Sequence, residues 1–101
     1  MKTYITIAGT GHYYGTDVFE KDMTVRLYKE PKNEYDRDAI RVEADGLGKV
    51  GYVANSVHTV RGESVSASRL YDRIGKKAQA KVVAIAPNAV ICAVRKKCLK
   101  K

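Results

Sequence analysis

Six short segments of the chain alternate apolar and polar residues with a period of two, and no other feature constrains the fold as strongly. Such alternation puts apolar side chains on one face of an extended chain, so each segment is expected to be a half-buried β-strand. Asp45-Gly46 and Pro87-Asn88 each separate two consecutive segments, which predicts two hairpins. The expected strands cover residues 4–8, 23–28, 39–44, 49–53, 78–86 and 89–95. With no βαβ rhythm and no internal repeat, the sequence predicts a mainly β fold, a compact six-stranded β-barrel.

One or two short helices are expected between the two hairpins. The first is a single turn capped by Asn55 or Ser56, and the second is capped by Ser66 or Ser68 and ends at Gly75. No linker composition separates these segments, and a length of 101 residues is typical of one domain. We therefore expect a single domain over residues 1–101.

The positive charge of the chain is concentrated in its last quarter. The formal net charge is +8, yet residues 1–74 hold 11 basic and 11 acidic residues, whereas residues 75–101 hold eight basic residues and no acidic one. If the last two strands pair, their basic residues form an electrostatic patch that attracts polyanions. The residues of this patch are Lys76, Lys77, Arg95 and Lys96. The alternative is a solvated surface that only improves solubility.

The cysteines and the hydropathy of the sequence indicate a cytoplasmic protein. Cys92 lies in an apolar run and Cys98 lies among lysines, which favours free thiols in a reducing compartment over a disulfide framework. The first residues are too polar for a signal peptide, and no apolar stretch is long enough to span a bilayer. We therefore expect no membrane partner.

No combination of residues indicates catalysis, a metal or a cofactor. Nucleophilic catalysis needs a nucleophile, a base and an orienting acid, yet the chain has two histidines and no nucleophile elbow. Cys92 and Cys98 lack the spacing of a zinc site, and residues 9–15 do not match a phosphate-binding loop. The sequence therefore predicts a protein that is not an enzyme and that holds no metal and no cofactor.

The segment from Glu30 to Ile40 combines turn residues with an aromatic ring and carboxylates. Pro31 restricts the backbone, and Asn33 and Asp36 readily bond to nearby backbone groups, so an ordered loop is expected. That loop presents the ring of Tyr35 beside an acidic side chain. Such a surface suits binding, without indicating the partner.

Tyrosine dominates the aromatic residues, with seven tyrosines, one phenylalanine and no tryptophan. Exposed tyrosine rings stack on the bases of single-stranded nucleic acid. In a small barrel they also cap the open ends, with the ring inward and the hydroxyl outward, and both interpretations remain open. Four of the tyrosines lie next to glycine or polar loop residues, namely Tyr13, Tyr14, Tyr35 and Tyr52.

Three motifs, in this order along the chain, resemble the HIRAN domain family. They are the tyrosine-rich loop at residues 11–15, the segment Glu30-Pro31-x-Asn33-x-Tyr35-Asp36-x-x-Ala39-Ile40, and the strand Val50-Gly51-Tyr52-Val53. The resemblance covers about residues 4–74. Members of this family occur at the N-terminus of certain DNA-repair helicase-like remodellers and as small standalone bacterial proteins. The resemblance implies an OB-like barrel that binds single-stranded DNA at a free 3′-hydroxyl end.

Carried over by position, the resemblance also implies the binding residues. Tyr13 and Tyr35 are the stacking rings, and Asn33 and Asp36 make polar contacts to the terminal sugar or base. Tyr52 extends the stacking surface. A carboxylate at such a site fits a terminus without phosphate, because it accepts a hydrogen bond from a hydroxyl group and repels a phosphate group.

The sequence departs from the better-known DNA-binding members at two places. They carry arginine at the position of His12 and basic side chains at the positions of Ala54 and Asn55. For His12 two interpretations remain open, a pH-dependent contact to phosphate and a neutral loop histidine bonded to the backbone. Both departures remove positive charge from the side chains that are expected to contact the phosphate groups of DNA. Two functions therefore remain: binding of single-stranded DNA or another nucleic acid, and a protein-interaction or adaptor domain that keeps the barrel without binding DNA.

Overall fold

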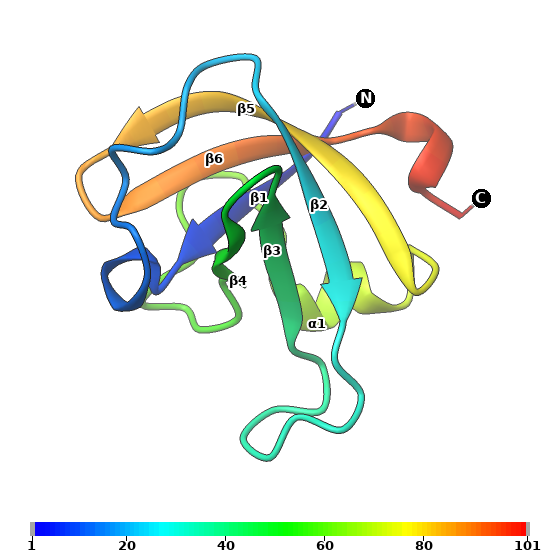
Figure 1. Ribbon diagram of the computed structural model, residues 1–101. Helices are drawn as coiled ribbons and strands as arrows, with labels where there is room; N and C mark the ends of the chain where they lie inside the picture. Colours follow the sequence, from blue (N-terminus) through cyan, green and yellow to red (C-terminus); the bar gives the residue numbers. More distant parts are fainter. Residues whose placement is uncertain (1, 101) are drawn as a thin grey trace.

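The computed structural model describes residues 2–100 and shows six antiparallel strands closed into a barrel (Figure 1). Around the barrel the strands follow the order β1-β4-β3-β2-β5-β6, and β6 pairs with β1 to close it. The predicted mainly β, six-stranded OB-like barrel is confirmed. The elements are β1 (Thr3–Ala8), η1 (Thr10–His12), β2 (Thr24–Lys29), β3 (Ile40–Ala44), β4 (Gly48–Val53), α1 (Ala67–Tyr71), β5 (Lys77–Ala86), β6 (Ala89–Val94) and η2 (Lys96–Cys98).

All six expected strands are present, with ends within one residue of the prediction. Both hairpins are also present, because β3 pairs with β4 and β5 pairs with β6. In the second hairpin Asn88 has φ of 67°, in the left-handed region that asparagine tolerates better than most residues. Local pattern and turn chemistry therefore specify these strands and connections.

The helical content is smaller than the sequence predicted. Ser66 caps α1, since its Oγ accepts a hydrogen bond from a backbone N–H of the first turn (3.3 Å). The helix ends at Tyr71 and not at Gly75, because the chain leaves the helical path and packs Ile74 into the core. After β4 the expected single turn is present, with the N–H of Thr59 donating to the carbonyl of Ser56 (2.9 Å), but it does not extend into a helix.

Apolar side chains from all six strands fill the barrel. In β2, Val25 and Leu27 are fully buried, whereas Arg26 and Tyr28 alternate with them and lie on the outer face. α1 adds Ala67 and Leu70 to this core and lies at the lower end of the barrel in Figure 1. Full burial of one such aliphatic side chain contributes about 1.5 to 3 kcal/mol. The core therefore holds the strands in register, and the outer face is left for polar and aromatic groups.

A bulge in β4 decides which side chains share one part of that outer face. Two consecutive residues of β3 are paired with Gly51 and Lys49, so Val50 is an extra residue in β4. Val50 and Gly51 are both buried, which interrupts the alternation of the strand. As a result Lys49 and Tyr52 lie on the same outer face although they are three residues apart in the sequence.

Both cysteines are free thiols. Cys92 is buried in β6, where desolvation raises its pKa to about 12, and Cys98 is half-buried in η2. Within residues 2–100, no helix is both long enough and apolar enough to cross a membrane.

Candidate nucleic-acid interface

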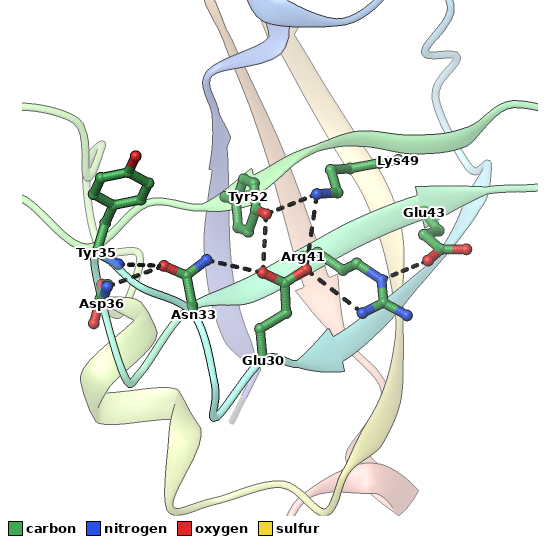
Figure 2. A network of polar contacts seen from close by, with 8 residues as sticks. All are labelled: Glu30, Asn33, Tyr35, Asp36, Arg41, Glu43, Lys49 and Tyr52. Carbon is green, nitrogen blue, oxygen red and sulfur yellow. Dashed lines mark hydrogen bonds and ion pairs between the residues drawn. The ribbon is translucent and has the colours of Figure 1, made fainter.

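The loop between β2 and β3, residues 30–39, projects beyond the end of the barrel (Figure 1). Asn33 organises it, because its Oδ1 accepts hydrogen bonds from the backbone N–H groups of Tyr35 (2.9 Å) and Asp36 (3.0 Å). The Nδ2 of Asn33 donates to Glu30 Oε1 (2.9 Å). Figure 2 shows that both ends of the amide are engaged within the protein. Asn33 therefore shapes the loop.

Asp36 connects this loop to the start of α1. Its Oδ1 accepts the backbone N–H of Asp38 (2.9 Å), and its Oδ2 accepts a hydrogen bond from Asn55 Nδ2 (2.9 Å). Asn55 in turn accepts the backbone N–H of Ser68 through its Oδ1 (2.8 Å). The carboxylate is thus held in one orientation by two separate segments, and each of its oxygens still has a free lone pair.

Tyr35 presents its ring to the solvent. The side chain is 94% exposed, and the hydrogen bond of this residue within the loop is made by its backbone N–H. In Figure 2 the ring points away from the polar network around Glu30. An exposed aromatic ring on a loop fixed by Asn33 and Asp36 is a surface for stacking that requires little rearrangement.

The carboxylate of Glu30 lies at the centre of a polar network on the outer face of β3 and β4 (Figure 2). The Tyr52 hydroxyl donates to Glu30 Oε1 (2.9 Å) and accepts from Lys49 Nζ (2.8 Å). Lys49 Nζ and Arg41 Nη1 lie 3.8 Å and 3.5 Å from Glu30 Oε2. Burial opposes the charge on Glu30, but the hydrogen bonds from Asn33 and Tyr52 and the charge of Lys49 outweigh it and lower the pKa of Glu30.

We expect Glu30→Gln to lower the free energy of unfolding by about 1.5 kcal/mol at pH 7, because the amide cannot serve the donors that face this carboxylate. Since the pKa of Glu30 is lowered by folding, its stabilising effect is complete above the unfolded-state pKa and is lost as the pH falls through the folded-state pKa. Urea unfolding at a series of pH values should therefore show the stability of the variant approaching that of the wild type as the pH falls below the unfolded-state pKa of Glu30 and through its lowered folded-state pKa. Glu34→Gln, at an exposed position of the same loop, is the control. A difference between Glu30→Gln and wild type that does not change with pH would contradict this account.

One open cavity of about 420 Å³ brings together five of the residues expected from the sequence. It is lined by Tyr13, Asn33, Tyr35, Asp36, Ala39, Tyr52 and Val53. Three tyrosine rings and one carboxylate, from the residue after η1, the 30–39 loop and β4, thus share a single depression. This cavity is called the tyrosine pocket below.

His12 is not among the residues that line the tyrosine pocket. It is an exposed residue at the end of η1, next to Tyr13 in the sequence. The structure therefore does not bring His12 together with the other expected residues.

The cation at the tyrosine pocket is Lys49, which the sequence analysis did not identify. Its Nζ lies 5.0 Å from the ring centroid of Tyr52 and 5.9 Å from that of Tyr13. Its hydrogen bond to Tyr52 raises the pKa of Lys49, so it remains charged at neutral pH. Strict alternation along β4 would put Lys49 and Tyr52 on opposite faces. Only the bulge at Val50 brings them together, and the sequence signal for it was Gly51, because an isolated glycine inside a strand often marks a bulge.

A family model described as HIRAN domain matches residues 2–98. The chain belongs to the HIRAN family. The family is one of nucleic-acid-binding domains. Two crystal structures share the fold of the chain. A protein from Lactobacillus plantarum is 18% identical, with a TM-score of 0.64, and 91% of this chain and 88% of that chain are covered. The HIRAN domain of human HLTF is 20% identical, with a TM-score of 0.62, and 92% of this chain and 74% of that chain are covered. No curated protein matches the sequence.

In this HIRAN barrel the basic residues of the expected electrostatic patch lie away from the tyrosine pocket. Lys76 and Lys77 are at the start of β5, whereas Arg95 and Lys96 follow β6. The two segments are neighbours, since the backbone N–H of Arg95 donates to the carbonyl of Gln79 (2.9 Å). All four basic side chains are exposed, and none forms an ion pair with a side-chain carboxylate of residues 2–100.

Proposed function

We propose that this HIRAN domain is a non-catalytic module that binds single-stranded DNA at a free 3′-hydroxyl end. The observation that carries the proposal is the meeting of three tyrosine rings and the Asp36 carboxylate in one open pocket. Tyr13 and Tyr35 stack on the terminal bases, and Tyr52 extends that surface. Lys49 supplies the positive charge for the nearest phosphate, because its ammonium group lies beside two of these rings and Arg41 also neutralises the Glu30 carboxylate with which Lys49 pairs.

Asp36 selects the terminus in this proposal. Its carboxylate is already oriented by Asp38 and Asn55, and the remaining lone pairs accept a hydrogen bond from a terminal hydroxyl. A phosphate in the same place would set two negative groups against each other at a cost of several kcal/mol. An acid inside a nucleic-acid site is therefore useful when the recognised end carries no phosphate.

The experiment compares two short oligonucleotides that differ only in a 3′-hydroxyl or a 3′-phosphate. We expect the wild type to bind the hydroxyl end at least about tenfold more tightly, as a repulsion of about 1.4 kcal/mol requires. In Asp36→Asn the preference should fall to near unity. Asp38→Asn, in the same loop, removes the same charge outside the pocket lining and should keep the preference.

Two outcomes would contradict the proposal. Equal wild-type affinity for the two oligonucleotides would remove Asp36 from its role as a selector. If the wild type binds neither oligonucleotide at low salt, the barrel serves instead as a protein-interaction or adaptor domain. Fluorescence anisotropy at two salt concentrations reads out both, because contacts to phosphate weaken as salt rises.

We also propose that residues 1–101 act as one domain in the cytoplasm. The barrel, α1 and η2 share one hydrophobic core, to which the half-buried Cys98 and Leu99 also contribute. A reducing compartment keeps Cys92 and Cys98 as the free thiols described above.

A further inference from the structure

Four neighbouring strands carry a transverse row of outward side chains that leads away from the tyrosine pocket. The register pairs Tyr52 of β4 with Arg41 of β3, Arg41 with Tyr28 of β2, and Tyr28 with Lys77 of β5. The Arg41 guanidinium lies over the Tyr28 ring, 4.7 Å from its centroid. These residues are called the outer row, and they are Tyr52, Arg41, Tyr28 and Lys77. The outer row therefore begins at a residue of the tyrosine pocket and ends at a lysine.

A second cavity, of about 260 Å³, lies at the far end of the outer row. It is lined by Arg26, Tyr28, Lys77, Ala78, Gln79, Lys97 and Cys98, and is called the lysine cleft here. Lys77 and Lys97 are exposed, and neither pairs with a side-chain carboxylate among residues 2–100. Arg26, by contrast, is already paired with Asp45. The uncompensated positive charge of the lysine cleft therefore comes from its two lysines.

The acids beside the outer row are neutralised by the protein itself. Glu43, the neighbour of Arg41 along β3, accepts a hydrogen bond from Arg41 Nε (2.6 Å) and lies 3.9 Å from Arg26 Nη2. Glu30 is held by Tyr52 and Lys49 as described above. A polyanion that follows the outer row thus passes paired acids before it reaches the unpaired lysines.

We propose that the outer row and the lysine cleft carry the upstream nucleotides of a single strand whose 3′ end occupies the tyrosine pocket. This inference rests on the proposed function and extends it from one pocket to a path. Adjacent strands are about 4.8 Å apart, so the row from β4 to β5 spans about 14 Å, the length of a few nucleotides. The Arg41 guanidinium plane, which covers the Tyr28 ring, offers a surface on which a base stacks, and Lys77 with Lys97 offers the charge for phosphates.

The test compares two single-stranded oligonucleotides with the same 3′ end, one of about three and one of about ten nucleotides, within the site sizes of OB folds. The Lys77→Ala/Lys97→Ala variant should bind the longer oligonucleotide about tenfold more weakly at 0.1 M salt. The slope of the logarithm of affinity against the logarithm of salt concentration should also be shallower by about 1.4, because two phosphate contacts to a single strand are lost. Its affinity for the shorter one should be unchanged. Lys2→Ala/Lys21→Ala removes two exposed lysines that also pair with no side-chain carboxylate among residues 2–100 and lie outside the lining of the lysine cleft, so it should have little effect on either.

The outcomes separate this inference from the function on which it rests. If the wild type binds the two lengths equally well, or if the control variant weakens binding as much as the cleft variant, the path is refuted and the pocket stands. If Tyr35→Ala changes neither affinity while the cleft variant still weakens the longer oligonucleotide, the pocket is refuted and the lysine cleft stands. If the wild type binds neither length, both proposals are refuted.

Discussion

Tyr35→Ala should lower the affinity for a short single-stranded oligonucleotide by about 5- to 150-fold, which is the loss of one stacked base at about 1 to 3 kcal/mol. The free energy of unfolding should stay within about 0.5 kcal/mol of the wild type. The reason is the position of the ring, which is 94% exposed and leaves the folding role of Tyr35 to its backbone N–H, a group that alanine retains. Fluorescence anisotropy and urea unfolding measure the two quantities separately.

Tyr14→Ala is the matched control for this loss of affinity. Tyr14 is 50% exposed, does not line the tyrosine pocket, and donates its hydroxyl to the carbonyl of Leu47 (3.2 Å). Its removal deletes a ring of the same size outside the tyrosine pocket and should leave oligonucleotide affinity unchanged. Unaltered binding by Tyr35→Ala, or an equal loss in both variants, would show that the exposed ring of Tyr35 is not a stacking surface.

The sequence predicted the barrel and the ordered loop that carries Tyr35 because both depend on local chemistry. Alternating residues marked every strand, and Asp45-Gly46 and Pro87-Asn88 marked the hairpins. The motif around Tyr35 marked a loop that the structure places at one end of the barrel (Figure 1). These features need no information from distant parts of the chain, so an inspection of short windows can find them.

The polar contacts of the site were harder to predict because they join segments that are distant in sequence. Asn33 was expected to contact a ligand, yet its amide is engaged by Glu30 and by backbone N–H groups of its own loop. Asn55 was identified only as a missing basic residue, whereas it braces the Asp36 carboxylate against the start of α1. Both roles follow from tertiary contacts that periodicity does not report.

Gly51 shows most directly how the barrel and the site depend on one another. A Cβ at this position would lie 2.7 Å from Ile7 Cγ2 and 2.9 Å from the backbone carbonyl oxygen of Ala8, both in β1. Its backbone φ is not in the left-handed region, so close packing, and not backbone freedom, is what requires glycine. Because Gly51 also takes part in the bulge of β4, any displacement of β1 from β4 moves Lys49 and Tyr52 as well.

We therefore expect Gly51→Ala to destabilise the protein by about 1 to 3 kcal/mol or more, because a backbone carbonyl cannot rotate away as a side chain can. Oligonucleotide affinity should fall with it, even under conditions where the variant remains folded, since Tyr52 and Lys49 no longer face the tyrosine pocket correctly. Gly75→Ala is the control, because a Cβ there meets no atom within 4 Å and its φ is not positive. Urea unfolding and anisotropy of the two variants give the comparison. Wild-type stability in Gly51→Ala would show that β1 and β4 separate at little cost, and unchanged affinity would show that the tyrosine pocket does not depend on their close approach.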